Sequence, residues 1–392
     1  MLLLPLKSPV YYDLQTSLGN WLDSDQEVSF QSSGNGDDPP MVLPKPPFTS
    51  QQCRTELLRL HSLRKCLSNS ILKPHSHKAA SEENALEDSM EYHAALLEFE
   101  QRGFPTLDDE NNELELVWKA AFSPQKEGHH TLVWDRACCL WNIAALYSQK
   151  MLTLAENYAE ERDAQKQIIQ YSQTAASLLN ILGQLVNSDE NMDLATVEMS
   201  KPMITFWEKW FLAQAQSTIP KIADQSKHSI LAALHASTHQ LFNEALACAQ
   251  DPRLQSEVPR FAKEWGAYCK AQSMLSSAKA EYHMALAHRT TQQWGHELAR
   301  LKTCWQKLQE AHKFLEAASE EQSLIGIRRQ VDTYLPFVEN RYQQAHTDNT
   351  TVYQDEVPAS LPDVEPKQLA KLNGGTLPEP MTNPKVKLFV NL

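Results

Sequence analysis

Glycine is scarce in this sequence, at 11 of 392 residues, and acidic residues outnumber basic ones by 49 to 36. Few glycines disfavour folds that depend on many tight turns. A net charge of −13 argues against general nucleic-acid binding. No segment resembles a secretory signal or a membrane span, and none of the seven cysteines belongs to a CxxC pair. These absences favour a soluble, cytosolic protein whose thiols are reduced and mostly buried.

The usual sequence signatures of catalysis are also missing. The chain has no dinucleotide-binding GxGxxG, no phosphate-binding P-loop, no GxSxG nucleophile motif and no HExxH zinc motif. Carboxylates cluster at Asp108 and Asp109, and histidines at His75 and His77. Without further ligands or a paired base, such groups are more typical of solvated loops. We therefore expect a non-enzymatic protein with no metal or other cofactor, and an enzyme that uses these side chains is the least favoured hypothesis.

Helical periodicity is the strongest pattern that the chain does contain. The stretch 130–149, HTLVWDRACCLWNIAALYSQ, places apolar residues on every side of a helix, and the charged Asp135 and Arg136 interrupt it. A helix that is apolar all round must be covered all round, so we expect it at the centre of a large helical domain. Further helices are predicted at about 51–69, 82–103, 161–186, 193–219, 226–249, 258–288, 291–318 and 320–345.

Two short segments follow a period of two instead. Leucines alternate with other residues from Leu2 to Leu6, and apolar residues alternate from Leu114 to Trp118. We expect these segments to pair in a small sheet beside the helices. Residues 31–50 are rich in proline and glycine and predict a loop without regular elements, and the chain after residue 348 predicts an extended arm.

Several further motifs follow one another along the chain: PLKSPVYYDL, YHAALLEFEQRGFP with LVWKAAF, the central helix, LAQAQ, AKAEYHMAL, WGHELARL and TTVYQDEVP. This series resembles the Bro-one domain family, the endosomal adaptor module of ALIX-like proteins. Each motif is weak alone, but they occur in the order that the family has. The resemblance implies a single Bro-one domain over residues 1–392, with residues 31–50 as an insert loop and 348–392 as a C-terminal arm.

The resemblance also implies a fold and a function. The fold would be mainly α, a curved, banana-shaped and solenoid-like domain with a tetratricopeptide-like core and a small N-terminal β-sheet. The function would be that of an adaptor whose hydrophobic groove binds the C-terminal amphipathic helix of an ESCRT-III subunit during endosomal and multivesicular body sorting. Such a protein would be cytoplasmic and would reach endosomes through its partners, which include other endosomal sorting proteins.

The family's groove positions fall on named residues of this chain when the two are aligned through LAQAQ and VYQDEVP. The apolar positions are Ile219, Ile230, Leu234 and Tyr342, and the rim carboxylate is Glu161. Ile230 and Leu234 are one helical turn apart, a spacing that is commoner in protein cores than in grooves. The alternative function is a tetratricopeptide-like scaffold that binds an unrelated peptide, although no regular 34-residue period is visible.

Overall fold

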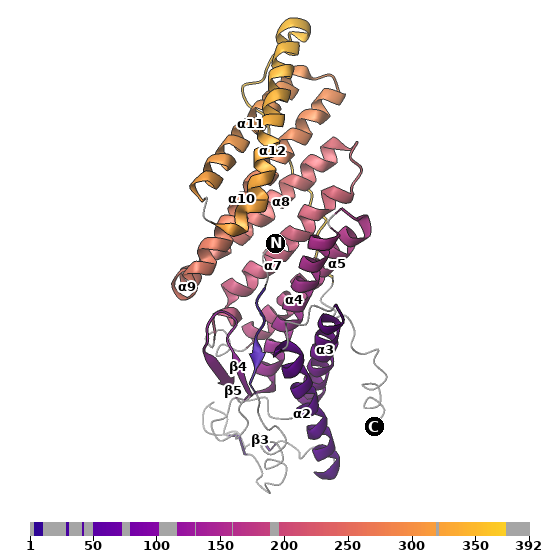
Figure 1. Ribbon diagram of the computed structural model, residues 1–392, viewed down its shortest axis with the longest axis vertical. Coiled ribbons are helices and arrows are strands. Elements are labelled where there is room, and N and C mark those ends of the chain that lie inside the picture. Colours follow the sequence, from indigo (N-terminus) through magenta and orange to yellow (C-terminus); the bar gives the residue numbers. More distant parts are fainter. Residues whose placement is uncertain are drawn as a thin grey trace. The chain divides into compact units, whose positions relative to one another are not determined.

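The computed structural model describes residues 4–10, 29–30, 41–42, 50–72, 79–101, 116–129, 131–158, 160–188, 196–318 and 321–373. Contacts between Cα atoms divide the chain into two compact units. Unit 1 comprises Met1–Pro5 and Tyr147–Pro378, and unit 2 comprises Leu6–Leu146 and Glu379–Leu392. Figure 1 labels the helices and strands of both. The single Bro-one domain that the resemblance implies over residues 1–392 stays a prediction.

Unit 2 contains a small sheet and the helices that follow it. The sheet is antiparallel, with β4 (Leu116–Lys119) between β1 (Ser8–Pro9) and β5 (Lys126–His129), and Ser8 faces Lys119. The helices are α2 (Ser50–Leu72), α3 (Ala79–Gln101) and the first part of α4 (Leu132–Asn157). The predicted pairing of two segments far apart in sequence is thus confirmed.

The first strand lies further along the chain than the leucine alternation predicts. The segment before β1 bonds to side chains of α4 instead of forming a ladder. The Leu4 N–H donates to the hydroxyl of Ser148 (3.3 Å), whereas Lys7 exchanges two main-chain bonds with the Asn142 amide (2.8 and 2.9 Å). Leu2 and Leu114 lie outside the described residues.

The predicted loop at residues 31–50 contains one short strand, so the prediction that it holds no regular element is wrong. Strand β3 (Met41–Val42) pairs antiparallel with β2 (Ser29–Phe30). Met41 and Val42 begin a run of three apolar residues, Met41 to Leu43, in a largely polar and proline-rich stretch, and valine favours extended backbone.

Unit 1 is built from helices that pack on their neighbours along the chain. After α4 come α5 (Arg162–Asn187), α7 (Lys201–Ile222), α8 (His228–Ala249), the short α9 (Pro252–Glu257), α10 (Pro259–Thr290), α11 (Trp294–Ala317) and α12 (Ile325–Asp348). Helix α7 packs between α5 and α8, and α10 packs against both α8 and α11. The predicted fold class, mainly α with a small N-terminal sheet, is confirmed, while the curved outline stays a prediction.

Prolines explain several helix boundaries in unit 1. Pro202, Pro252 and Pro259 all lie in the first turn of a helix, where a missing N–H costs no hydrogen bond. Helix α7 therefore begins at Lys201 rather than at Asp193, and a single 3-10 turn (Val197–Met199) precedes it. Pro220 does not end α7, which continues to Ile222.

The central helix α4 is covered as its composition predicts. Between Leu132 and Ser148 every side chain is buried except those of Val133 and Arg136, which are half-buried. The core of unit 1 contains a separate aromatic cluster on α7 and α10, formed by Phe206, Trp207, Trp210, Phe211, Phe261 and Trp265.

The described part of the C-terminal arm, which ends at Asn373, is extended as predicted and crosses several helices of unit 1. Its main chain bonds to Arg300 of α11, then to the carbonyl of Ala233 in α8, then to the Gln216 side chain of α7, and finally to Ser177 of α5. The arm thus meets the helices in the reverse of their chain order.

Two of the motifs that carry the resemblance meet where the arm begins. Trp294 stacks on Tyr353 (3.9 Å between ring centroids), and the N–H groups of Trp294 and Gly295 donate to the Asp355 carboxylate (2.9 and 3.3 Å). A Cβ on Gly295 would lie 2.0 Å from the carbonyl oxygen of Glu356. Glycine is needed here because the main chain of the arm occupies that space.

Candidate partner-binding surface

The residues predicted to bind a partner all belong to unit 1, but the structure exposes them differently. Ile230, in the first turn of α8, is 41% exposed, whereas Leu234 is 1% exposed. Ile219, near the end of α7, and Tyr342, in α12, are half-buried. Glu161 directly precedes α5 and is exposed.

Leu234 lies in the core of unit 1 although it follows Ile230 by one turn. Helix α8 packs against α7 and α10, and the Leu234 carbonyl accepts hydrogen bonds from Gln216 of α7 (3.3 Å) and from the Thr238 hydroxyl (3.0 Å). The Gln216 amide also binds the arm, accepting from the N–H groups of Leu369 and Ala370 at 3.0 Å. The Ile230 side chain is therefore accessible to a ligand, whereas that of Leu234 is not.

Ile219 lies on the other side of the turn that joins α7 to α8. The Gln225 side chain closes this turn by donating to the carbonyls of Pro220 (2.8 Å) and Ala223 (3.0 Å). These bonds satisfy acceptors that the end of α7 leaves free, as a helix end requires. Ile219 precedes the turn and Ile230 follows it, so two apolar residues from neighbouring helices flank it.

Glu161 belongs to the same end of α7. The adjacent Arg162 donates to the carbonyl oxygen of Ile222 (3.4 Å), the last residue of that helix. This contact brings the start of α5 to the end of α7. We call the surface formed by Glu161, Ile219 and Ile230 the α7-end surface.

Tyr342 is held at a different place. Its ring stacks on Trp305 of α11 (5.6 Å, 15° between planes) and meets His346 edge-on (6.2 Å). It also packs against a buried cluster that contains Ala285 of α10 and Leu301 of α11. The contacts of Tyr342 therefore tie it to α10 and α11.

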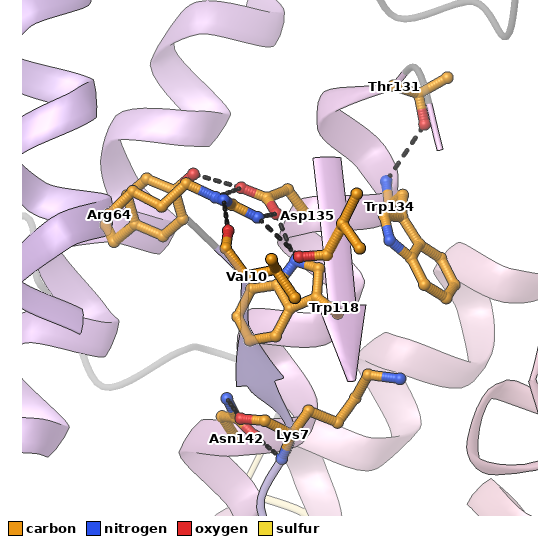
Figure 2. Close-up of polar contacts among 10 residues, drawn as sticks. Lys7, Val10, Arg64, Trp118, Thr131, Trp134, Asp135 and Asn142 are labelled. Atoms are coloured by element: carbon orange, nitrogen blue, oxygen red, sulfur yellow. Dashed lines mark hydrogen bonds and ion pairs between the residues drawn. The ribbon is translucent and has the colours of Figure 1, made fainter. Parts of the chain in front are cut away.

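The most elaborate polar site lies in unit 2 and was not predicted. Figure 2 shows the Arg64 guanidinium and the Trp118 indole turned towards Asp135. The buried Asp135 carboxylate accepts from Arg64 (3.3 and 3.1 Å), from the Tyr92 hydroxyl and from the Trp118 indole N–H. Arg64 also donates to the carbonyls of Val10 (2.7 Å) and Val117 (3.3 Å).

The electrostatics of this site indicate a structural role. Burial, and then the Asp135 carboxylate, raise the pKa of Tyr92 well above its ordinary value. Burial acts to lower the pKa of Arg64, but the neighbouring Asp135 and Tyr92 outweigh it and raise that pKa. The carboxylate is thus enclosed by donors and has no exposed surface for a substrate. The sequence signal was Asp135 itself, because an acid inside a helix that is apolar all round must be paired.

The other groups considered for chemistry do not assemble into a site among the described residues. No grouping of three or more His, Cys, Asp or Glu side chains that could hold a metal occurs there, and His129 packs on the Trp134 ring (4.2 Å). Asp108, Asp109, His75 and His77 lie outside the described residues. Within the described part of the chain, no helix is both long and apolar enough to cross a membrane. Cys138, Cys139, Cys269 and Cys304 are buried free thiols, as predicted.

Comparison with known sequences identifies relatives over most of the chain. The family model described as BRO1-like domain matches residues 48–392. The chain is 24% identical over 307 residues to the pH-response regulator protein palA/RIM20 of Saccharomyces cerevisiae, which covers 77% of this chain and 41% of that protein. It is 24% identical over 338 residues to the vacuolar protein-sorting protein BRO1 of Gibberella zeae (81% and 33%). A human relative, tyrosine-protein phosphatase non-receptor type 23, is 24% identical over 247 residues (62% and 14%). The chain spans less than half the length of these relatives.

Comparison with solved structures shows the same fold. The structure described as "ALIX BRO1 CHMP4C complex" aligns with a TM-score of 0.73 at 22% identity and covers 95% of this chain and 94% of that one. The structure described as "Structure basis for endosomal targeting by the Bro1 domain" aligns with a TM-score of 0.69 at 17% identity and covers 95% and 92%.

Proposed function

Because this chain belongs to the BRO1-like domain family, we propose that it is a non-enzymatic adaptor that binds the C-terminal amphipathic helix of an ESCRT-III subunit. It acts in endosomal and multivesicular body sorting. Its relatives include vacuolar protein-sorting proteins, and a protein of the same fold is described in complex with CHMP4C. The protein works in the cytoplasm and is recruited to endosomes through this subunit and other sorting proteins.

The α7-end surface is the observation that carries this proposal. An amphipathic helix needs apolar anchors from neighbouring elements and a polar rim. Ile219 and Ile230 supply anchors from α7 and α8, and Glu161 supplies the rim carboxylate. Leu234 lies in the core one turn after Ile230, and Tyr342 of α12 is proposed as a further contact of the partner helix.

The polar site around Asp135 gives no support to a catalytic function. The Asp135 carboxylate is saturated by donors, so it is a poor candidate for a general base. The relative described as a tyrosine-protein phosphatase shares only 14% of its length with this chain, so its name carries no activity over.

A titration with a matched pair of variants tests the proposal. C-terminal peptides of each ESCRT-III subunit are titrated into the purified chain, into Ile230→Asp and into Ile325→Asp. Ile325 of α12 is 40% exposed, almost the same as Ile230 at 41%, but it lies away from the α7-end surface. An aspartate at residue 230 would be stripped of water by an apolar ligand without gaining a partner.

We expect one subunit's peptide to bind the parent with micromolar affinity, about −8 kcal/mol. Ile230→Asp should weaken binding at least a hundredfold, and Ile325→Asp should not change it. Both variants should melt like the parent because the substituted positions are solvated. If no ESCRT-III peptide binds the folded parent, the proposal fails and a scaffold for an unrelated peptide takes its place. Equal loss in both variants would remove the α7-end surface from the site.

A further inference from the structure

A second surface lies on α10, where three half-buried side chains share one face of the helix. These are Lys279, Tyr282 and His283, at helical spacings of three and four residues. On one side the His283 ring stacks with two rings of α8, those of His235 (5.3 Å, 11° between planes) and His228 (5.7 Å, 25°). The imidazoles of α8 therefore border this face.

The other side of the same face is bordered by α12. Tyr282 meets Tyr334 (5.5 Å) and Phe337 (5.7 Å), and Phe337 is 52% exposed. The Lys279 ammonium donates to the amide oxygen of Gln330 (3.3 Å). We call the residues Lys279, Tyr282 and His283, with their neighbours His228, His235, Tyr334 and Phe337, the α10 strip.

Burial lowers the pKa values of three basic groups in the α10 strip, and basic neighbours act in the same direction. Burial first, and then the nearby Lys221, lower the pKa of Lys279 to about 8. Burial also lowers the pKa of His235 to about 3, with Lys279 and His283 acting in the same direction. For His283 the pKa falls to about 4 because of burial, followed by His228 and Lys279. The charged form of each group is thus destabilised mainly by burial and secondly by its neighbours.

The polar atoms of the strip also have unused hydrogen-bonding capacity. The Nδ1 atoms of His228 and His283 are buried without a hydrogen-bond partner. Elsewhere on α10 the ionised groups are paired: the Glu281 carboxylate forms ion pairs with Arg300 (2.8 Å) and Lys307 (2.8 Å). The Lys279 ammonium donates to an amide oxygen, whereas the Lys307 ammonium donates to a carboxylate. Among the described residues Lys279 forms no ion pair with a carboxylate, although the chain has 49 acidic and 36 basic residues.

We propose that the α10 strip is a docking site for an acidic peptide segment of a partner protein that carries an aromatic or aliphatic residue next to its carboxylate. The carboxylate sits between Lys279 and the imidazoles of His228 and His283, where charge-assisted hydrogen bonds are strong. The apolar residue covers the exposed face of Phe337 beside Tyr334. The partly desolvated Lys279 ammonium favours a carboxylate ligand. The rings of Tyr334 and Phe337 beside it favour a ligand with an apolar side chain over a simple anion.

This site is separate from the α7-end surface. Ile230 follows His228 by two positions, which is about 200° around a helix. The two residues therefore face opposite sides of α8. The proposal does not rest on the binding of an ESCRT-III helix.

The test uses three acetylated peptides: Glu-Phe-Glu-Phe-Glu, its counterpart Gln-Phe-Gln-Phe-Gln, and Glu-Ser-Glu-Ser-Glu. Each is titrated at pH 7 into the full chain, with inorganic phosphate as a fourth ligand, and binding is followed by the NMR signals of the histidine rings. The variants are Lys279→Gln, Lys279→Arg and, as a matched control, Lys302→Gln, which removes an exposed lysine of α11.

We expect the Glu-Phe peptide to bind the parent at least tenfold more tightly than either of the other peptides, and to shift the ring signals of His228 and His283. Lys279→Gln should lose at least tenfold in affinity while melting no lower than the parent, because it removes a poorly solvated charge. Lys279→Arg and Lys302→Gln should bind within threefold of the parent. Absence of binding, equal binding of the glutamine peptide, or unchanged binding by Lys279→Gln would overturn the proposal. Phosphate binding as tight as that of the Glu-Phe peptide would also overturn it, by showing a simple anion site.

Discussion

The cores of the two units are held together by different interactions. In unit 2, one buried carboxylate, Asp135, joins side chains from α2, α3 and β4. In unit 1, aromatic rings of α7 pack on aromatic rings of α10, and the ring centroids of Trp207 and Trp265 are 4.2 Å apart. The first arrangement depends on charge and hydrogen-bond geometry, and the second on shape and apolar area.

This difference determines how each core responds to substitution. A buried polar network is stable when every group is paired, but removing one partner leaves the others desolvated and unsatisfied. An aromatic cluster loses stability in proportion to the volume removed, and a similar ring restores most of it. The two cores should therefore differ most when a substitution keeps the shape of a side chain and changes its charge.

The largest effect is expected at Asp135. Asp135→Asn keeps the shape but leaves the Arg64 guanidinium without its counter-ion, which costs about 3–5 kcal/mol. Weakened bonds to the Tyr92 hydroxyl and the Trp118 N–H add about 1–3 kcal/mol each. Chemical denaturation followed by tryptophan fluorescence measures the loss. The double variant Asp135→Leu with Arg64→Met should recover part of it, and a stable Asp135→Asn protein would contradict the comparison.

Trp207 should show the opposite pattern in unit 1. Trp207→Ala should cost about 3–5 kcal/mol because it leaves a cavity beside Trp265 and Phe261. Trp207→Phe keeps a ring in the cluster and should cost less than about 1.5 kcal/mol. The same denaturation experiment gives both values. If Trp207→Phe were as damaging as Trp207→Ala, unit 1 would be no more tolerant of shape-preserving changes than unit 2.

The pair on α8 sharpens the comparison within unit 1. Leu234→Asp places an unpaired carboxylate in the core and should destabilise the protein by about 3 kcal/mol. Ile230→Asp, one turn earlier, should change stability by less than about 0.5 kcal/mol. Thermal melts of the two variants decide this. Parent-like stability of Leu234→Asp would mean that this residue lines an open groove.

The smallest effect is an acid sensitivity of unit 2. Burial, and then Arg136, lower the pKa of His93 in α3 from 6.5 to about 3. Below pH 6.5 this imidazole is protonated in the unfolded chain but stays neutral in the folded protein. The free energy of unfolding is therefore highest above pH 6.5 and falls as the pH approaches 3. The loss between pH 7 and pH 5 should be about 2 kcal/mol. His93→Gln should flatten this part of the pH profile, and an unchanged slope would show that His93 titrates normally.

Local sequence patterns account for most of the helices because periodicity needs only neighbouring residues. Helix α8 was expected at 226–249 and runs over His228–Ala249, and α10 was expected at 258–288 and runs over Pro259–Thr290. Long-range contacts account for the errors. The first strand lies at Ser8–Pro9 because Ser148 and Asn142 of α4 bind the residues before it.

The candidate site followed from the sequence less completely than the fold did. The resemblance selected Ile219, Ile230 and Glu161; Ile219 is near the end of α7, Ile230 is in the first turn of α8, and Glu161 precedes an arginine that contacts the last residue of α7. Their role in binding stays a prediction. The resemblance could not distinguish the buried Leu234 from the exposed Ile230, because their exposure depends on how α7, α10 and the arm pack against α8. Asp135 was visible as an interruption of an apolar helix, but its partners Arg64, Tyr92 and Trp118 come from segments far away in the chain.

The most direct test of the proposed function is to observe which isoleucine methyl groups respond to an ESCRT-III peptide. With the isoleucine methyls isotope-labelled, the signals of Ile219 and Ile230 are assigned by substitution and followed by NMR as the best-binding C-terminal peptide is added. We predict that both signals shift with the same micromolar dissociation constant, while that of Ile325 stays in place. Binding that shifts Ile325, or binding that leaves Ile219 and Ile230 unchanged, would contradict the assignment of the α7-end surface.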